Sequence, residues 1–184
     1  MNLKKIWHFL WQSDSALSWI IDLILALAII KFIFFPLIGL ILSSSLPLVA
    51  VESTSMIHEG NFDYFWDTHG DFYKQMNITK ETFSEWKFKN GFNKGDVMAI
   101  QGSDDYNVGD VIVFRVINQA TPIIHRIIKK ENEVYSTKGD HNQYQLSYET
   151  SILKEQIVGK AIGRFPAIGW LKLVFTDAFK SIIK

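Results

Sequence analysis

The chain has 184 residues, 19 basic and 19 acidic side chains, and no cysteine. This length allows one domain of ordinary size and an additional segment. The formal net charge of zero argues against a nucleic-acid-binding protein, which usually carries a basic excess. The absence of cysteine excludes disulfides, thiol catalysis and thiolate zinc sites. Because 48% of the residues are hydrophobic, the composition also excludes a disordered chain.

A continuous apolar segment near the N-terminus predicts a membrane-spanning helix. Residues 19–42 contain seventeen Leu, Ile and Phe residues and only two charged ones, Asp22 and Lys31. A helix of this length rises about 36 Å, more than the roughly 30 Å of a hydrocarbon core. We therefore expect one transmembrane helix over residues 15–43, preceded by a short cytoplasmic or interfacial segment over residues 1–14.

The flanks of this segment predict its start and its orientation. Asp14 or Ser15 is expected to cap the helix. Lys4 and Lys5 precede the span and favour a cytoplasmic N-terminus, which places the rest of the protein on the other side of the membrane. Lys31 lies deep in the span and is expected to face a partner helix, a polar groove or a water defect. A cleaved signal peptide is disfavoured, because the apolar run is too long and no small-x-small site closely follows it.

Short β-prone runs follow the span and predict a mostly β domain over residues 44–164. Gly-Asp pairs at 95–96, 109–110 and 139–140 mark turns between the runs. The runs do not alternate with helices, so a parallel α/β sheet is not expected. The strand-like runs lie at 46–53, 96–101, 110–117, 122–128, 133–138 and 157–164.

Two segments differ from this β pattern. Residues 57–94 are polar and aromatic, and we expect an insertion over one edge of the sheet with a short helix near Thr79. Within it, Asn77-Ile78-Thr79 matches the N-glycosylation pattern, which matters only in a glycosylating compartment. The tail over residues 165–184 has apolar residues at helical spacing and predicts an amphipathic helix. This helix either lies on the membrane or packs on the β domain.

Three residues are candidates for nucleophilic catalysis. Ser55 follows the first strand-like run, and a serine becomes a nucleophile when an adjacent base takes its proton. His125 lies within a strand-like run and can be that base, although a buried core histidine is the alternative. Asp140 lies in a Gly-Asp turn and can orient a histidine and stabilise its charged form.

Six motifs that include these residues occur in a fixed order behind the apolar segment. They are VESTSM at 51–56, GDV at 95–97, GDVIVF at 109–114, IIHRII at 123–128, TKGDHN at 137–142 and IVGK at 157–160. The ordered set resembles the conserved boxes of type I signal peptidases. The resemblance covers residues 45–165 apart from the insertion. Histidine rather than lysine before the arginine of the fourth box is typical of the archaeal and endoplasmic-reticulum branch.

The resemblance implies a role for each matching residue. Ser55 matches the nucleophile, His125 the general base and Asp140 the acidic residue of the catalytic centre. Ser53 matches a position that helps to bind the oxyanion, and the backbone N–H of Ser55 would supply the second donor.

The sequence also departs from the family pattern. Thr54 replaces a common glycine, and His58 stands where proline often follows. A second aspartate often lies six residues after the first, and here that position is Leu146. Glu149 is the nearest downstream carboxylate and is the alternative third catalytic residue, with Asp140 preferred.

By resemblance, we expect a membrane-bound serine endopeptidase that cleaves N-terminal signal peptides from exported preproteins after small-x-small sites. No cofactor and no metal is expected. The expected partners are signal peptides, membrane lipid and the protein translocation machinery. The protein would cross the cell membrane or the endoplasmic-reticulum membrane once, with its catalytic domain outside the cytoplasm. About a dozen residues separate the span from Ser55, which places the nucleophile near the membrane surface.

Three alternatives remain. One is a catalytically inactive, membrane-tethered β module that binds a protein partner through residues 57–94. Another is an autoprocessing peptidase with a serine–lysine dyad, for which Lys138 is the nearby base. The last is a metal site assembled from His58, His69, His141, Asp67 and Asp71, which lack a recognised ligand spacing.

Overall fold

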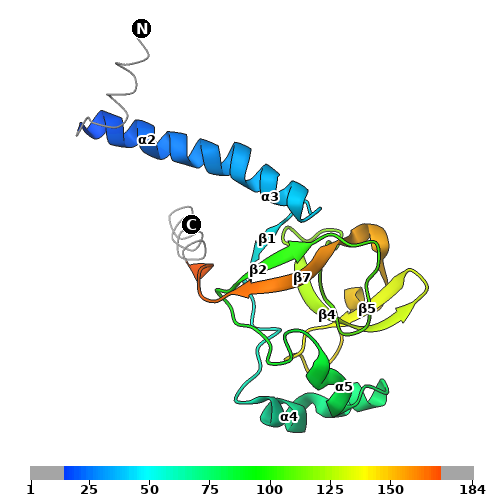
Figure 1. Cartoon of the computed structure of the whole chain (residues 1–184). Helices are drawn as coiled ribbons and strands as arrows, with labels where there is room; N and C mark the ends of the chain where they lie inside the picture. The colour runs from blue at the N-terminus through cyan, green and yellow to red at the C-terminus, as the bar shows by residue number, and fades with distance from the viewer. Residues whose placement is uncertain (1–14, 171–184) are drawn as a thin grey trace. The chain divides into compact units, whose positions relative to one another are not determined.

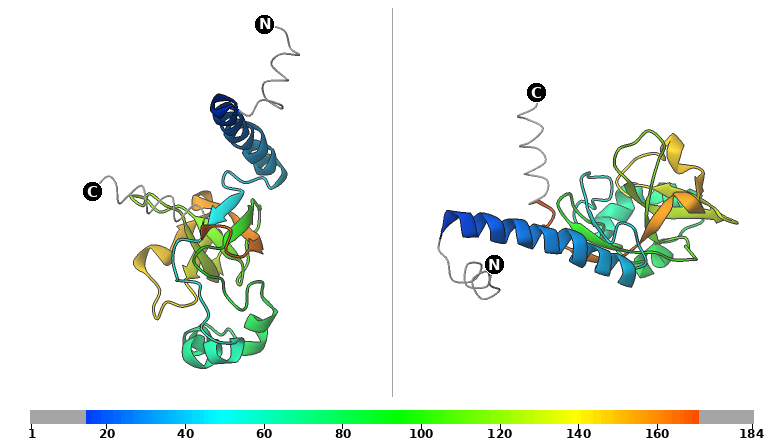
Figure 2. Two further views of the ribbon diagram at one scale, coloured as in Figure 1. Left: turned by 90° about the vertical axis from the view of Figure 1, so that its left-hand side faces the viewer. Right: turned by 90° about the horizontal axis from the view of Figure 1, so that it is seen from above.

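The computed structural model describes residues 15–170. These residues form two compact units, which divide between Ile41 and Leu42. The predicted C-terminal amphipathic helix falls mostly on residues 171–184, outside the described residues. Figures 1 and 2 show the chain from three directions.

The first unit is one long apolar helix, as predicted. Ala16–Ile41 contains 26 residues with a mean hydropathy of 2.7 and is long and apolar enough to cross a membrane. The hydroxyl oxygen of Ser15 accepts the backbone N–H of Ser18 at 3.2 Å and caps the helix, whereas Asp14 lies outside the described residues. The helix comprises α2 (Ala16–Ile29), η1 (Ile30–Phe34) and α3 (Phe35–Ile41).

The helix widens into a π-helical turn at η1, which ends two residues before Pro36. Pro36 has no N–H to donate to the carbonyl oxygen of Phe32, and its ring crowds that oxygen. A wider turn relieves both problems and explains why the π segment lies here. Lys31 lies in this turn, with its Nζ 5.4 Å from the centroid of the Phe32 ring. Its polar environment in a membrane stays a prediction.

The second unit is built on a curled, antiparallel sheet of seven strands, which confirms the predicted mostly β fold (Figure 1). The strand order is β1-β2-β7-β3-β4-β5-β6, so β1 and β6 are the edge strands. Each predicted run contains a strand, and β6 is an addition that the sequence pattern did not indicate. The strands are β1 (Leu48–Ala50), β2 (Val97–Gln101), β3 (Val111–Phe114), β4 (Ile123–Glu131), β5 (Val134–Lys138), β6 (Ile152–Leu153) and β7 (Ile157–Phe165).

A β-bulge interrupts the hairpin of β4 and β5. The pairing runs from Glu131–Val134 to Lys129–Ser136, and then shifts by one residue to Ile127–Thr137 and Arg126–Lys138. A shift of one residue moves the following side chains to the opposite face of the sheet. This shift affects which residues of the next turn lie beside His125.

Residues 57–94 form a helical insertion with its own aromatic core. The predicted short helix is α5 (Lys80–Glu85), capped by Thr79, and the longer α4 (Phe62–Gln75) was not predicted. Figure 1 shows the two helices side by side below the strands. The insertion core includes Ile128 of the interior strand β4, so the insertion packs against that strand. The other core members are Phe65, Trp66, Tyr73, Ile78 and Phe83.

The main core of the β unit lies directly beneath the loop that carries Ser55. Val51 and Met56 flank this loop, and each is 1% exposed. They pack in one cluster with Met98 and Ile100 of β2 and Val113 of β3. Full burial of such side chains contributes about 1.5–3 kcal/mol each, so both ends of the loop are anchored.

Candidate active site

Ser55 lies on a loop that other segments hold by backbone hydrogen bonds. The N–H of His141 donates to the carbonyl oxygen of Ser55 at 2.9 Å. The N–H of Phe92 donates to the carbonyl oxygen of Met56 at 3.0 Å. These hydrogen bonds restrain the backbone of the residue that carries the Ser55 hydroxyl.

A chain of hydrogen bonds joins Ser55, His125 and Glu149. The Ser55 Oγ lies 2.8 Å from His125 Nε2, and His125 Nδ1 lies 2.5 Å from Glu149 Oε1. An ionised carboxylate only accepts hydrogen bonds, so we assign the proton to Nδ1. Nε2 then presents its lone pair to the Ser55 hydroxyl, as a general base requires.

Glu149 is buried and held on both of its oxygens. It ends the short 3₁₀ helix η2 (Ser147–Glu149), and the N–H of Leu146 donates to its Oε2 at 2.7 Å. The Thr137 hydroxyl lies 3.5 Å from Oε1, and the Gln145 amide donates to the Glu149 carbonyl oxygen at 3.1 Å. These contacts orient the carboxylate toward His125.

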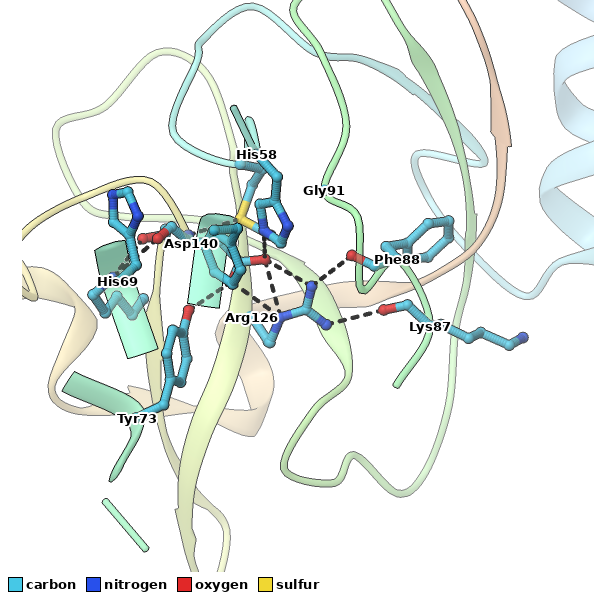
Figure 3. Close-up of polar contacts among 12 residues, drawn as sticks. His58, His69, Tyr73, Lys87, Phe88, Gly91, Arg126 and Asp140 are labelled. Carbon is cyan, nitrogen blue, oxygen red and sulfur yellow. Dashed lines mark hydrogen bonds and ion pairs between the residues drawn. The ribbon is translucent and has the colours of Figure 1, made fainter. Parts of the chain in front are cut away.

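Asp140, the preferred candidate in the sequence, lies in a different network (Figure 3). Its Oδ1 accepts Arg126 Nε at 3.0 Å, and its Oδ2 accepts Arg126 Nη2 at 2.7 Å. The Tyr73 hydroxyl donates to Oδ1 at 2.8 Å, and His58 Nε2 lies 2.9 Å from Oδ2. All four side chains are buried.

In the structure, Glu149 and not Asp140 contacts His125 Nδ1, so Glu149 has the position expected of Asp140, and the catalytic role of either carboxylate stays a prediction. His125 and Arg126 are neighbours on β4, and successive strand residues point to opposite faces. Each consequently has its own carboxylate partner. Burial alone would raise the pKa of Asp140, but the charge of Arg126 and the His58 hydrogen bond hold it well below its usual range. Asp140 is thus an ionised partner of Arg126.

Ser53, the candidate for oxyanion binding, lies beside Ser55. The two hydroxyl oxygens of Ser53 and Ser55 are 3.0 Å apart. Because the Ser55 proton is directed to His125, we assign Ser53 as the donor in this pair. The hydroxyl hydrogen of Ser53 therefore points at the Ser55 oxygen.

A pocket of about 440 Å³ opens beside Ser55 and His125. Its walls come from the edge strand β1 and from Pro122, Ile123 and Ile124 at the start of β4. Leu146 and Tyr148, which flank the start of η2, also line it. An exposed strand edge beside apolar side chains suits an extended peptide, which can pair with the edge while its side chains enter the pocket.

Lys138 does not contact the Ser55 hydroxyl, which is bonded to His125. Its Nζ donates to the carbonyl oxygens of Gly139 at 3.0 Å and Asp140 at 3.3 Å. Burial lowers the pKa of Lys138 to about 8. The hydrogen bonds favour a histidine base over the serine–lysine dyad.

Among the described residues, the other histidines are His58 and His69 in the insertion and His141 in the turn after β5. His58 stacks on Phe65, with ring centroids 3.5 Å apart, and the centroids of His69 and His141 are 5.4 Å apart. Burial lowers the pKa of His69, as does the nearby positive charge of Lys138. Within residues 15–170, no group of three His, Asp or Glu side chains is arranged to hold a metal ion.

A serine, a histidine and a buried carboxylate beside a peptide-sized pocket form the arrangement of a serine hydrolase. The chain is also similar to catalytic subunits of the signal peptidase complex. It is 25% identical over 107 residues to SEC11 of Ogataea parapolymorpha, covering 47% of this chain and 61% of the relative. It is 30% identical over 97 residues to sec11 of Dictyostelium discoideum, covering 47% and 54%.

A third relative, SEC11C of Canis lupus familiaris, is 30% identical over 98 residues, which cover 47% of this chain and 51% of the relative. The chain thus spans about half the length of the curated relatives it matches. No family model matches the chain. The names of the relatives confirm the resemblance to signal peptidases of the endoplasmic-reticulum type.

Proposed function

We propose that this protein is a membrane-anchored serine endopeptidase that removes N-terminal signal peptides from exported preproteins. The observation that carries this proposal is the hydrogen-bonded chain Ser55–His125–Glu149 beside the pocket. The similarity to SEC11 catalytic subunits supports the substrate class. The apolar helix Ala16–Ile41 supports membrane anchoring.

The reaction begins with attack on the scissile peptide bond. The Ser55 oxygen bonds to the carbonyl carbon while its proton moves to His125 Nε2. Glu149 accepts the Nδ1 proton in a hydrogen bond and stabilises the resulting imidazolium. His125 then gives its proton to the leaving amine, and the peptide bond breaks to leave an acyl-enzyme.

Water completes the reaction by the same proton path. His125 takes a proton from water as the oxygen attacks the acyl carbon, and returns it to Ser55 as the ester bond breaks. In both halves, the oxyanion would accept the backbone N–H of Ser55 and the hydroxyl of Ser53. Ser53 is 3.0 Å from the nucleophilic oxygen, so its hydroxyl can turn from that oxygen to the oxyanion.

We propose that the substrate lies extended along β1, with its side chains directed at the pocket. Specificity for small residues one and three positions before the cut would come from the aliphatic walls of the pocket, which leave little space for large side chains. About a dozen residues separate the spanning helix from Ser55. This tether would keep the nucleophile near the membrane surface, where a signal peptide presents its cleavage site.

We propose that the protein crosses the cell membrane or the endoplasmic-reticulum membrane once, with a cytoplasmic N-terminus. The proposed partners are signal peptides, membrane lipid and the translocation machinery. Lys4 and Lys5 before the helix support this orientation.

Cleavage of a synthetic preprotein by the purified full chain, reconstituted in lipid, tests the proposal. Wild type should cut after a small-x-small site, and Ser55→Ala and His125→Ala should lose cleavage while remaining folded. A folded wild type that is inert in lipid would instead favour the inactive β module or a requirement for a partner subunit. Full cleavage by His125→Ala would favour a lysine base.

A further inference from the structure

Residues 57–94 take no part in the chemistry above, yet they surround the carboxylate of Asp140. Two of its hydrogen-bond partners belong to this segment. The Tyr73 hydroxyl, from α4, donates at 2.8 Å, and His58, from the start of the segment, lies at 2.9 Å (Figure 3). Because the pKa of Asp140 is held low, His58 Nε2 is the donor in its pair.

The same segment encloses Arg126, the third partner of Asp140. The guanidinium carbon lies 4.7 Å from the ring centroid of Phe83 and 5.7 Å from that of Trp86. The guanidinium also donates to the carbonyl oxygens of Lys87 at 3.0 Å and Phe88 at 2.9 Å. The insertion therefore supplies the aromatic walls and two of the acceptors of this buried guanidinium, and Gly109 and Asp140 supply the others.

The backbone on either side of Asp140 packs against Ser55 and His125. The next residue, His141, donates its N–H to the carbonyl oxygen of Ser55 at 2.9 Å. The preceding residue, Gly139, packs so closely that an added Cβ would lie 2.9 Å from both His125 Nε2 and the Ser55 carbonyl oxygen. A displacement of Asp140 would therefore move Gly139 and His141, which pack against Ser55 and His125.

We propose that the insertion is a clamp for the catalytic centre, and that Tyr73 and His58 are positioning residues. Acting through Asp140, they hold the turn of residues 139–141 against Ser55 and His125. This inference rests on the proposed peptidase function and assigns the insertion an internal role in place of partner binding. Neither residue lines the pocket beside Ser55, so both act on the turnover rate more than on peptide binding.

The test compares two tyrosines of the same helix. Tyr73→Phe removes only the hydroxyl that donates to Asp140, whereas Tyr64→Phe makes the same change at a side chain that is 53% exposed. For the full chain in lipid, we expect Tyr73→Phe to lower kcat about tenfold and to change KM less than about twofold. Tyr64→Phe should match wild type in both constants.

Assays run well below the thermal midpoint of each variant separate positioning from stability. A purely structural Tyr73 would lower the midpoint and leave kcat of the folded protein unchanged, and that outcome would overturn the inference. If wild type itself does not cleave, the proposed function fails. If wild type cleaves and Tyr73→Phe has the wild-type kcat, only the clamp fails.

His58 provides a second, independent comparison. This comparison tests the clamp if Tyr73→Phe does not fold. His58→Gln keeps a donor near the position of Nε2, whereas His58→Leu removes it. We expect His58→Leu to lose about tenfold in kcat and His58→Gln to recover most of it. Equal and full kcat in both variants would contradict the clamp.

Discussion

Glu149→Gln tests the assignment of the third catalytic residue because it removes a charge with little change in volume. The N–H of Leu146, 2.7 Å from Oε2, must face the oxygen of the new amide. The amide nitrogen then faces His125 Nδ1, where Oε1 now lies at 2.5 Å. Two donors cannot share one hydrogen bond, so His125 must place its proton on Nε2. Nε2 then has no lone pair for the Ser55 proton.

We expect kcat of Glu149→Gln to fall about 10³–10⁴-fold, as when the wrong histidine tautomer faces a serine nucleophile. This loss corresponds to about 4–5.5 kcal/mol in the activation barrier. KM should change little, because Glu149 lies behind His125 and does not line the peptide pocket. The assay is initial-rate cleavage of a preprotein peptide by the full chain, with circular dichroism to verify folding.

Asp140→Asn is the matched control, because it removes a charge from the other carboxylate. We expect it to lower the melting temperature markedly, since it weakens a buried partner of Arg126, and to lower kcat much less than Glu149→Gln does. The assignment would be refuted if folded Glu149→Gln kept more than a tenth of the wild-type kcat while folded Asp140→Asn kept none.

Three further changes have defined outcomes. In Gly139→Ala the new methyl group would lie 2.9 Å from His125 Nε2, so kcat should fall more than about 100-fold in folded protein, and normal turnover would show that this approach is not critical. Ser53→Ala should lower kcat about 100-fold with an unchanged KM, whereas an effect on KM alone would assign Ser53 to peptide binding. Burial lowers the pKa of Lys138 to about 8, so the unfolded state binds more protons between pH 8 and 10. Wild type should therefore gain stability relative to Lys138→Met over this range in urea unfolding, and a pH-independent difference would contradict the shift.

The strands were predictable because each has a β-prone run bounded by turn residues, as at 96–101 and 110–117. The apolar helix was predictable from length and composition alone. Helix α4 was missed, although Asn61 caps it and Phe65, Trp66 and Tyr73 form its buried face. Aspartates and a glycine between these aromatic residues obscured the helical period, and the cap was the usable signal.

In the candidate site, Ser55 and His125 were predictable from ordered motifs, and the structure brings them within 2.8 Å of each other. The positioning roles of Tyr73 and His58 had no sequence signal. Their relation to Asp140 arises only when the insertion folds onto β4. Long-range contacts of this kind depend on tertiary packing, which local patterns do not encode.

The choice between Asp140 and Glu149 depended on one extra residue in a hairpin. If the pairing of Glu131 with Val134 and Lys129 with Ser136 continued without interruption, it would place His125 opposite Asp140. The bulge next to Ile127 shifts the register, so that Arg126 pairs with Lys138 and the continuation brings Gly139 opposite His125.

That shift has two consequences for the proposed chemistry. Asp140 moves to the face of Arg126, where it becomes an ion-pair partner held by the insertion. Gly139 has no side chain, so the space in which His125 contacts Ser55 stays open. The carboxylate that binds His125 must then come from a residue beyond the turn. Glu149 supplies it from η2, beside Thr137 on the same face as His125. The bulge thus explains why two carboxylates nine residues apart have different partners.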